Sequence, residues 1–391
     1  MTKVLSISSD RKIFEEGSAV RARMVEYAGL FEELHIVVFS TRRTDHGTQT
    51  TEHKIQIAPN CTIYRTNSWN RWFYIFDAIW IGKRIIRNSK FLIPNSVITG
   101  QDPFETGYVA MKIATRFKLP LHIQIHTDFL NPYFKRASFL NRVRVLIARR
   151  VLPKANAIRV VSQRIFNSLK ELRIRNFELR TKILPIFTDV EKLRSAEPSF
   201  SLQQKYSHFG FIILVVARLT YEKNVQFALR ILKKLVKKYP TTGLVIVGDG
   251  PLKRSLQLQA NSLQLSKNVV FEGWQHDTIS YYKTANLYLQ TSLYEGFGLA
   301  LFEAVASGCP AVSSDVGIAP ELLNHKGHSF DCPVNDLNCF VSTISQLIED
   351  NQLRTFYALQ IAPHAVDELA KTKEQYLHEY KNSIEGAYQS N

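Results

Sequence analysis

The chain has 391 residues, which is too long for one compact core and predicts two domains. Hydrophobic residues make up 45% of it and charged residues 21%, values that are ordinary for a globular protein and exclude a disordered or fibrous one. The net charge of +16 is uneven, because residues 1–190 hold 31 Lys and Arg against 15 Asp and Glu, whereas the remainder holds 19 of each. Nucleic acid and an anionic membrane surface both fit such a basic half, and so does a solvated basic surface without a partner.

Targeting and redox signals are absent from the sequence. No apolar run approaches the roughly 18 residues that a membrane span needs, and the N-terminal residues have the pattern of a first strand and no signal-peptide core. Four cysteines (Cys61, Cys309, Cys332 and Cys339) form no Cys-x-x-Cys pair. We therefore expect a cytoplasmic protein with neither a disulfide framework nor a zinc site.

Short β-branched runs alternate with longer helical patterns over residues 1–185. Strands are expected at 4–8, 35–39, 62–65, 96–99, 121–125 and 157–161, and helices at 18–31, 69–87, 104–117 and 139–152. This alternation is typical of a parallel, doubly wound sheet.

A polar, irregular stretch at 186–210 interrupts this pattern and is expected to be a linker. The alternation then restarts over 211–370, with strands at 211–217, 244–247, 269–272, 287–290 and 310–313 and helices at 225–238, 252–263 and 299–307. A last helix at 371–391 is expected to pack back toward the first domain. The sequence thus predicts two Rossmann-like α/β domains that face each other across a deep cleft, where the carboxyl ends of parallel strands bind ligands.

The strongest chemical signal follows the expected strand 287–290. There the sequence continues as TSLYEGFGLALFEAVASGCP, which combines a glycine-rich turn with the start of a helix. Free amides at a helix start, together with the helix dipole, suit an anionic or hydroxyl-rich ligand. Glu295 and Glu303 lie about two helical turns apart and can face the same side. Their carboxylates are suited to accept hydrogen bonds from sugar hydroxyls.

The block from Ser292 to Pro310 resembles the retaining glycosyltransferases of family 4, which have the GT-B fold. The family hallmark is a Glu, seven residues and a second Glu within such a block, and this chain matches it almost position for position. The resemblance implies that Glu295 contacts the hydroxyls of a donor sugar and that Glu303 contacts the ribose hydroxyls. It also implies that the turn and helix start hold the donor, through Gly296, Phe297, Gly298 and Leu299.

Three other segments agree with this family in the expected order. Arg218 and Lys223 follow the strand 211–217, where two fixed cations would meet a diphosphate leaving group in the absence of a metal. Gly248 belongs to a Gly-x-Gly-Pro turn with either a structural or a ligand-binding role. Gly273 and Trp274 end a strand where family members place the nucleotide base, although a core or surface role for Trp274 stays open. Asn224 stands where the family commonly has a Gly.

The first half carries weaker signals for the acceptor side. His126, Thr127 and Asp128 end an apolar strand, and the family has a His at the equivalent place near the donor sugar. A satisfied structural histidine is the other interpretation. Asp128 either orients His126 or meets the acceptor. Gly17 is expected to bring backbone amides near phosphate or acceptor, and Asp102, which ends another strand, to line the acceptor pocket.

The aromatic stretch 69–84 lies between basic flanks. Trp69, Trp72, Phe73, Phe76 and Trp80 share one helix face, which is either an interfacial membrane helix or a helix packed on the sheet. Seven basic residues follow at Lys135, Arg136, Arg142, Arg144, Arg149, Arg150 and Lys154. Both interpretations stay open, and the first would place the protein on the inner face of the cytoplasmic membrane with a lipid-linked acceptor.

The sequence contains no Asp-x-Asp motif, so we expect no metal and no other cofactor. We expect transfer of a hexose-type sugar from a UDP- or GDP-linked donor to a saccharide or lipid-linked acceptor, with retention at the anomeric carbon as the resemblance implies. Cell-envelope glycan or glycolipid synthesis is the expected context. The alternatives are a nucleotide-sugar epimerase of the same fold, a non-catalytic sugar-nucleotide-binding subunit, and a nucleic-acid-binding protein. No recognition motif supports the last, so no nucleic-acid partner is expected.

Overall fold

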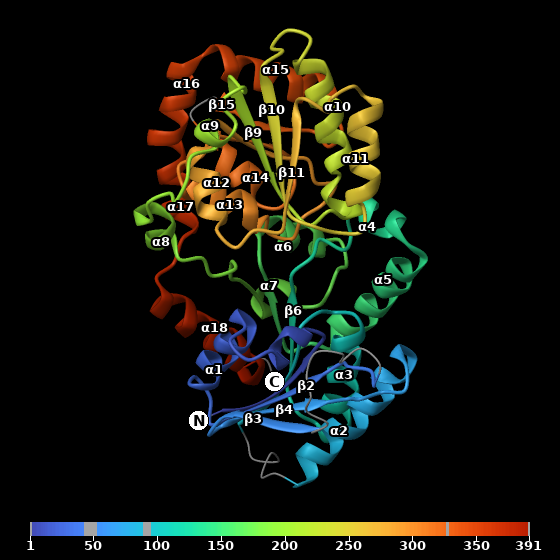
Figure 1. Cartoon of the computed structure of the whole chain (residues 1–391). Coiled ribbons are helices and arrows are strands. Elements are labelled where there is room, and N and C mark those ends of the chain that lie inside the picture. The colour runs from blue at the N-terminus through green and yellow to red at the C-terminus, as the bar shows by residue number, and fades with distance from the viewer. Residues whose placement is uncertain (1, 43–52, 89–94, 326–327, 390–391) are drawn as a thin grey trace. The chain divides into compact units, whose positions relative to one another are not determined.

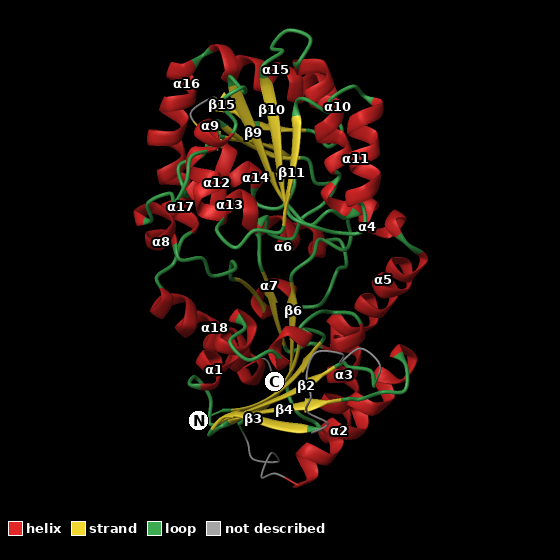
Figure 2. Ribbon diagram, in the orientation of Figure 1, coloured by secondary structure: helices red, strands yellow, loops and turns green. Residues whose placement is uncertain are grey.

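The structure is a computed structural model that describes residues 2–42, 53–88, 95–325 and 328–389 (Figure 1). It divides into two compact units. Unit 1 contains residues 1–130, 138–184 and 374–391, and unit 2 contains residues 131–137 and 185–373. Each unit is built around one largely parallel sheet with helices on both faces, which confirms the predicted pair of Rossmann-like α/β folds (Figure 2).

Unit 1 has an eight-stranded sheet in the order β3-β4-β2-β1-β5-β6-β7-β8, parallel except for β3. Its strands are β1 (Lys3–Ser8), β2 (Glu33–Val38), β3 (Lys54–Ala58), β4 (Cys61–Arg65), β5 (Ser96–Gly100), β6 (Leu121–Ile125), β7 (Ala157–Val160) and β8 (Thr181–Ile183). β5, β6 and β7 are buried along their whole length, as the interior of a sheet covered on both faces requires. The two strands that the sequence did not predict are β3, which is a half-exposed edge, and β8, which has three residues.

Helices cover both faces of this sheet. α3 packs on β1 and β5 and lies between α2 and α5, whereas α1 and α18 lie on the other face (Figure 1). The helical segments of unit 1 are η1 (Arg11–Phe14), α1 (Ala19–Ala28), η2 (Arg71–Phe73), α2 (Tyr74–Asn88), α3 (Glu105–Phe117), α5 (Phe139–Val151), η3 (Leu152–Lys154), α6 (Gln163–Lys170), α7 (Phe177–Arg180) and α18 (Lys373–Gln389).

Unit 2 has a six-stranded parallel sheet in the order β11-β10-β9-β12-β13-β16. Its strands are β9 (Phe211–Val216), β10 (Thr242–Val247), β11 (Val269–Gly273), β12 (Leu287–Gln290), β13 (Ala311–Ser314) and β16 (Asp331–Cys332). β9 consists of six apolar residues and lies in the middle of the sheet, the position predicted for the seven-residue apolar run. β14 (Asn324–His325) and β15 (His328–Ser329) form a separate antiparallel pair.

The helices of unit 2 bury the residues that recur at helical spacing. In α10 these include Val225, Ala228, Leu229, Leu232 and Leu235, which form one apolar stripe. The helical segments are α4 (Pro132–Ala137), α8 (Val190–Ser195), α9 (Leu202–Lys205), η4 (Tyr221–Lys223), α10 (Val225–Leu235), α11 (Lys253–Ser262), α12 (Thr278–Thr284), α13 (Leu299–Ala306), α14 (Ala319–Leu323), α15 (Leu337–Glu349), α16 (Asn351–Phe356), η5 (Tyr357–Ile361) and α17 (Ala362–Leu369).

The unit boundaries differ from the sequence prediction in two places. The expected linker 186–210 is not a free connection, because α8 and α9 lie within unit 2 and α8 packs on α13. The segment 131–137 also belongs to unit 2 although it lies within the predicted first domain. Its Phe134 ring meets Tyr294 edge-on, with 5.6 Å between the centroids. Among the described residues, no helix is long and apolar enough to cross a membrane.

The aromatic face of α2 does not pack on the sheet. Trp72, Phe76 and Trp80 are 73, 69 and 62% exposed, so that the packed alternative for these side chains is wrong. The opposite face of the helix is buried instead, at Ala78, Gly82, Ile85 and Ile86. The helix also begins later than expected, at Tyr74, so that Trp69 precedes it.

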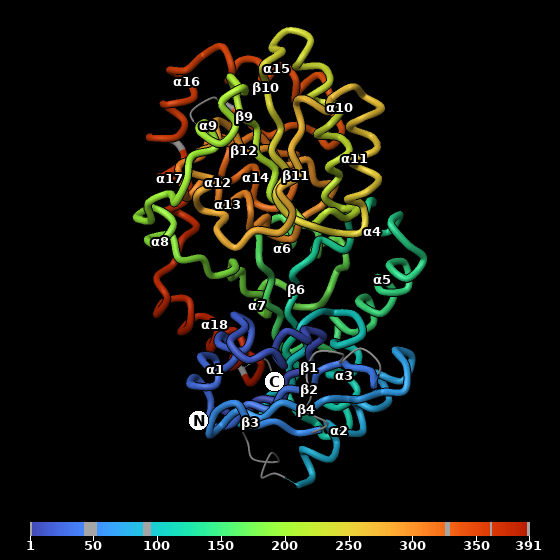
Figure 3. The backbone as a smooth tube through the Cα atoms, viewed as in Figure 1, coloured from blue at the N-terminus to red at the C-terminus, as the bar shows by residue number. Residues whose placement is uncertain are grey.

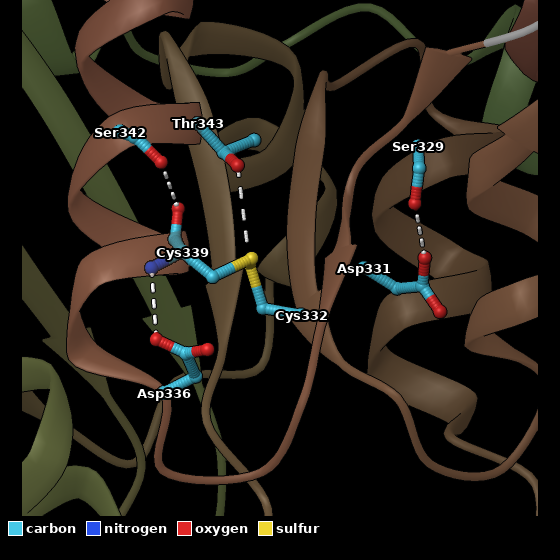
Figure 4. Close-up of a disulfide and its surroundings, with 7 residues drawn as sticks. All are labelled: Ser329, Asp331, Cys332, Asp336, Cys339, Ser342 and Thr343. Carbon is cyan, nitrogen blue, oxygen red and sulfur yellow. Dashed lines mark hydrogen bonds between the residues drawn. A yellow bond between two sulfur atoms is a disulfide. The ribbon is translucent and has the colours of Figure 1, made fainter.

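A disulfide joins Cys332 at the end of β16 to Cys339 in the first turn of α15 (Figure 4). The sequence did not predict it, because a separation of seven residues is no recognised motif. The side chain of Asp336 caps α15 by accepting a hydrogen bond from the Cys339 amide at 3.0 Å. The disulfide and this cap therefore fix the loop 332–339.

The C-terminal helix α18 is held in unit 1 by a buried arginine. In Figure 3 the last segment of the chain, drawn in red, lies beside the N-terminal segment, drawn in blue. Arg159 of β7, only 3% exposed, donates hydrogen bonds to Tyr376 Oη of α18 at 3.1 Å, to Gln124 Oε1 at 3.0 Å and to the Leu184 carbonyl at 3.2 Å. Tyr27 of α1 stacks on Tyr380 with 4.2 Å between the ring centroids. One guanidinium thus ties three segments together.

Replacing this arginine should destabilise unit 1. In Arg159→Ala the three acceptors lose a buried donor, so that we expect the free energy of unfolding to fall by about 3 kcal/mol. Chemical denaturation of the full chain measures it. Arg116→Ala, which changes an exposed arginine of α3, is the matched control and should change stability by less than about 0.5 kcal/mol. Equal effects of both variants would contradict the role of Arg159.

Candidate functional site

An ion pair joins the segment after β9 to the turn after β12 in unit 2. Lys223, the last residue of η4, donates from Nζ to Glu295 Oε1 at 2.5 Å. Ser292 donates from its hydroxyl to the same oxygen at 2.8 Å. The Lys223 and Glu295 side chains are only 20 and 12% exposed, so that solvent screens this pair weakly. The structure thus fixes a cation and a carboxylate that the sequence had assigned to one site.

The glycine-rich turn leads directly into α13. Gly298 has a φ of +102° and precedes the first residue of this helix, and no side chain caps the helix start. The Phe297 carbonyl accepts a hydrogen bond from the Ile318 amide at 2.9 Å. A Cβ at Gly317 would lie 2.2 Å from this carbonyl oxygen, so that only glycine permits the close approach. Sequence reasoning missed Gly317, for which its place just after β13 was the only signal.

Glu303 lies in the second turn of α13 and is partly buried. Tyr282 donates its hydroxyl to Glu303 Oε2 at 3.2 Å. Burial raises the pKa of Glu303, and the hydrogen bond from Tyr282 only partly offsets this. Tyr282 is itself buried against Tyr288, with 5.9 Å between the ring centroids. A further hydrogen-bond donor that reached the Glu303 carboxylate would therefore stabilise its charged form.

Arg218 is not part of the ion pair. Its side chain is 71% exposed and its guanidinium lies 3.4 Å from Glu222 Oε1 in the same loop. The neighbouring Gly248 has a packing role, because a Cβ there would lie 2.0 Å from the Ala217 carbonyl oxygen. Gly250 likewise lies against Leu219. The Gly-x-Gly turn therefore supports the backbone from which Arg218 projects.

Gly273 and Trp274 end β11 at the same edge of the sheet. Gly273 has a φ of +72°, and its carbonyl accepts a hydrogen bond from the Gly248 amide at 2.7 Å. The Trp274 side chain is 61% exposed, so that a core role is wrong. The indole ring of Trp274 therefore lies at the surface, at the end of β11.

Asn224 follows the ion-pair lysine in a left-handed conformation with a φ of +49°. Asn tolerates this region better than most residues, which explains why it can stand where glycine is common. Its side-chain amide donates to Asn335 Oδ1 at 2.9 Å, and Asn335 in turn donates to Tyr133 Oη of α4 at 3.5 Å. Asn335 lies within the loop that the disulfide closes. Neither Asn335 nor Tyr133 could be assigned to the site from the sequence.

The parallel sheet of unit 2 collects these groups at one edge. The loops after β9, β10, β11, β12 and β13 all leave from the carboxyl ends of neighbouring strands. They carry Lys223, Gly248, Trp274, Glu295 and Gly317 respectively. In this position an α/β sheet binds ligands, and the edge offers a cation, two carboxylates, an aromatic ring and a helix start.

The residues predicted in unit 1 also gather at one edge. Gly17, Asp102 and His126 lie in the loops after β1, β5 and β6, which are adjacent strands. Burial, together with the positive charges of Arg159 and Arg23, lowers the pKa of His126 to about 3, so that the imidazole is neutral at pH 7.

The two aspartates of this edge are buried to different degrees, Asp102 partly and Asp128 almost fully. Asp128 is 6% exposed. Burial raises the pKa of Asp102 to about 6, against the hydrogen bond that the Phe104 amide donates to it at 2.7 Å. Gly17 has a φ of +76° with open space where a Cβ would lie, so that its role is conformational.

Comparison with known proteins relates part of unit 2 to a known family. Residues 203–358, which lie in unit 2, match the family model of the glycosyl transferases group 1. The chain is 25% identical over 241 residues to an alpha-monoglucosyldiacylglycerol synthase of Streptococcus pneumoniae, covering 59% of this chain and 54% of that protein. It is 26% identical over 198 residues to a UDP-Gal:alpha-D-GlcNAc-diphosphoundecaprenol alpha-1,3-galactosyltransferase of Escherichia coli, covering 48 and 51%. The chain thus spans about half the length of these relatives.

A solved structure extends the likeness over the whole chain. The Anabaena protein HepE, crystallised in complex with UDP, superposes with a TM-score of 0.72 at 19% identity and covers 100% of both chains. At this identity the likeness concerns the fold. Residues 203–358 are thus similar to the glycosyl transferases group 1, and the two units have the GT-B fold.

Proposed function

We propose that this protein is a retaining, metal-independent glycosyltransferase. It transfers a hexose-type sugar from a UDP- or GDP-linked donor to a saccharide or lipid-linked acceptor. The observation that carries this proposal is the clustering of Lys223, Glu295 and Glu303 at the carboxyl edge of the unit 2 sheet, beside the start of α13. The names of the two relatives support it, because one makes a glucosylated diacylglycerol and the other transfers galactose from UDP to a diphosphoundecaprenol-linked sugar.

The donor binds along this edge of unit 2 in the proposed arrangement. Glu303 accepts hydrogen bonds from the ribose hydroxyls, which stabilise a carboxylate that burial otherwise disfavours. The ring of Trp274 stacks on the base, and the backbone of Gly273 and Gly248 allows its close approach. The amides at Gly296, Phe297, Gly298 and Leu299 face the sugar and the diphosphate at the helix start.

Charge compensation comes from the loop after β9. The ammonium group of Lys223 is already held in place by Glu295 and meets the leaving diphosphate, and the exposed guanidinium of Arg218 swings in to complete a bidentate contact. As the bond from the anomeric carbon to the diphosphate oxygen breaks, the acceptor oxygen bonds to the same face of that carbon. The acceptor proton passes to the departing phosphate oxygen. Glu295 holds a sugar hydroxyl and Lys223 in position and forms no covalent intermediate.

Unit 1 supplies the acceptor side. The neutral imidazole of His126 can both donate and accept a hydrogen bond at a sugar hydroxyl. Asp102 and Asp128 accept hydrogen bonds from hydroxyl groups of the acceptor substrate. The backbone at Gly17 lies near phosphate or the acceptor substrate. The proposed setting is envelope glycan or glycolipid synthesis at the cytoplasmic side of the membrane, without nucleic acid as a partner.

Turnover of nucleotide sugars tests this proposal. We expect the purified chain to release UDP or GDP from a donor only when a saccharide or glycolipid acceptor is present, in buffer that contains EDTA. Proton NMR of the product should show the anomeric configuration of the donor. An inverted product would contradict the retaining mechanism, and isomerisation of the donor without an acceptor would identify an epimerase instead.

Removing the fixed cation should impair chemistry more than folding. We expect Lys223→Met to lower kcat by about a hundredfold or more, because the departing diphosphate loses its nearest positive charge. The matched control is Lys238→Met, which breaks an exposed ion pair with Glu349 of the same 2.5 Å length outside the site. Steady-state kinetics and a thermal melt of each variant separate the two effects. A Lys223→Met enzyme with normal kcat would remove Lys223 from the mechanism.

A further inference from the structure

The outer face of α2 and of the segment before it is apolar and lies open to solvent. Trp69, Trp72, Phe76 and Trp80 are between 62 and 73% exposed, and Phe73 is 44% exposed. From Trp72 the positions recur at helical spacing, so that the rings form one stripe along the outside of η2 and α2. Soluble monomers rarely expose so many large apolar side chains together, and such a patch marks an interaction surface.

Arginines lie within and beside this aromatic stripe. The guanidinium carbons of Arg71 and Arg84 lie 5.6 Å from the ring centroids of Trp72 and Trp80, respectively. Arg84 and Arg87 continue the same exposed face toward the end of α2. Ala78, Gly82, Ile85 and Ile86 bury the inner face of the helix, so that the aromatic stripe is not needed for packing in unit 1.

A second helix of the same layer, α5, repeats this pattern. α3 lies between α2 and α5 on one face of the unit 1 sheet (Figure 1). On α5, Phe139 and Leu146 are 79 and 67% exposed and alternate with the exposed Arg142, Arg149 and Arg150. Together α2, α3 and α5 carry nine Lys and Arg against two Asp and Glu. The layer therefore combines an apolar surface with a strong positive charge.

We propose that this outer layer of unit 1, formed by α2, α3 and α5, docks onto the surface of an anionic lipid bilayer. Trp72 and Trp80 enter the headgroup region, where an apolar ring with a polar N–H is most stable, Phe76 adds apolar area beside them, and the arginines contact lipid phosphates. A protein partner would have to match nine Lys and Arg with a strongly acidic surface, whereas an anionic bilayer supplies negative charge at its headgroups. Single-stranded nucleic acid is usually bound in a basic groove with stacking rings, whereas this stripe runs along the outside of a helix.

This docking goes beyond the proposed chemistry but serves it. A lipid-linked acceptor lies in the plane of the membrane, and attachment of unit 1 there restricts the search for it to two dimensions. The carboxyl edge that carries Asp102 and His126 belongs to the same unit. Docking itself needs no donor and no acceptor, so that vesicle binding can fail while turnover of a soluble acceptor persists, and the reverse.

Vesicle co-sedimentation of the full chain tests the apolar part of this surface. The vesicles contain phosphatidylcholine alone or with roughly one-third phosphatidylglycerol, which supplies the negative charge. We expect binding to the anionic vesicles only. In Trp72→Ser/Phe76→Ser/Trp80→Ser the partition constant should fall by about a hundredfold. Leu179→Ser/Leu258→Ser, which changes two leucines that are 88 and 63% exposed elsewhere, is the control and should bind as the wild type does.

A second pair of variants tests the charge. Arg149→Gln/Arg150→Gln should lower partitioning by about tenfold or more, whereas Lys234→Gln/Lys237→Gln removes the same charge from unit 2 without effect. High salt should weaken wild-type binding. Failure of the wild type to bind anionic vesicles, or equal losses in the test and control variants, would overturn the proposal. Binding of a single-stranded oligonucleotide in place of vesicles, lost in the triple variant, would reassign the surface to nucleic acid.

Discussion

The contact between Lys223 Nζ and Glu295 Oε1 joins two loops that are 72 residues apart in the sequence and leave neighbouring strands of one sheet. Both side chains are largely buried, so that removing either one would leave a buried charge without its partner. The loop after β9 must therefore approach the turn after β12 closely, and the surrounding backbone is built for this approach. Ser292, the left-handed Asn224 and the glycine at position 317 each remove a clash or satisfy a polar atom beside the pair.

The loop that the disulfide closes contacts the residue next to the ion pair. Asn335 lies between the two bridged cysteines and accepts the hydrogen bond from Asn224, the neighbour of Lys223. α4, which precedes this region by some two hundred residues in the chain, contacts the same cluster through Tyr133 and Phe134. Elements from distant parts of the chain thus support one cation whose position the proposed chemistry requires.

Much of this architecture could be predicted from the sequence, because β-branched runs specify buried parallel strands and the Glu295–Glu303 block specifies a turn followed by a helix. The exposure of Trp72, Phe76 and Trp80 could not be predicted, since helical spacing groups side chains on one face without saying what covers that face. The packing of 131–137 in unit 2 and the role of Gly317 depend on contacts between segments that lie apart in the sequence. The disulfide spans only seven residues, but it depends on the fold that brings the end of β16 to the first turn of α15. The spacing of residues within one segment of the sequence does not predict such contacts.

In the proposed function, the carboxyl edge of unit 2 binds a nucleotide sugar. A thermal-shift panel of UDP-, GDP- and ADP-linked sugars in EDTA measures this directly, with Glu303→Ala beside the exposed-site control Glu349→Ala. We predict a rise in Tm with one donor that only Glu303→Ala abolishes. Since burial raises the pKa of Glu303 and donor binding favours its carboxylate, the rise should grow as the pH increases through that pKa. No rise with any donor, or an undiminished rise in Glu303→Ala, would contradict the account.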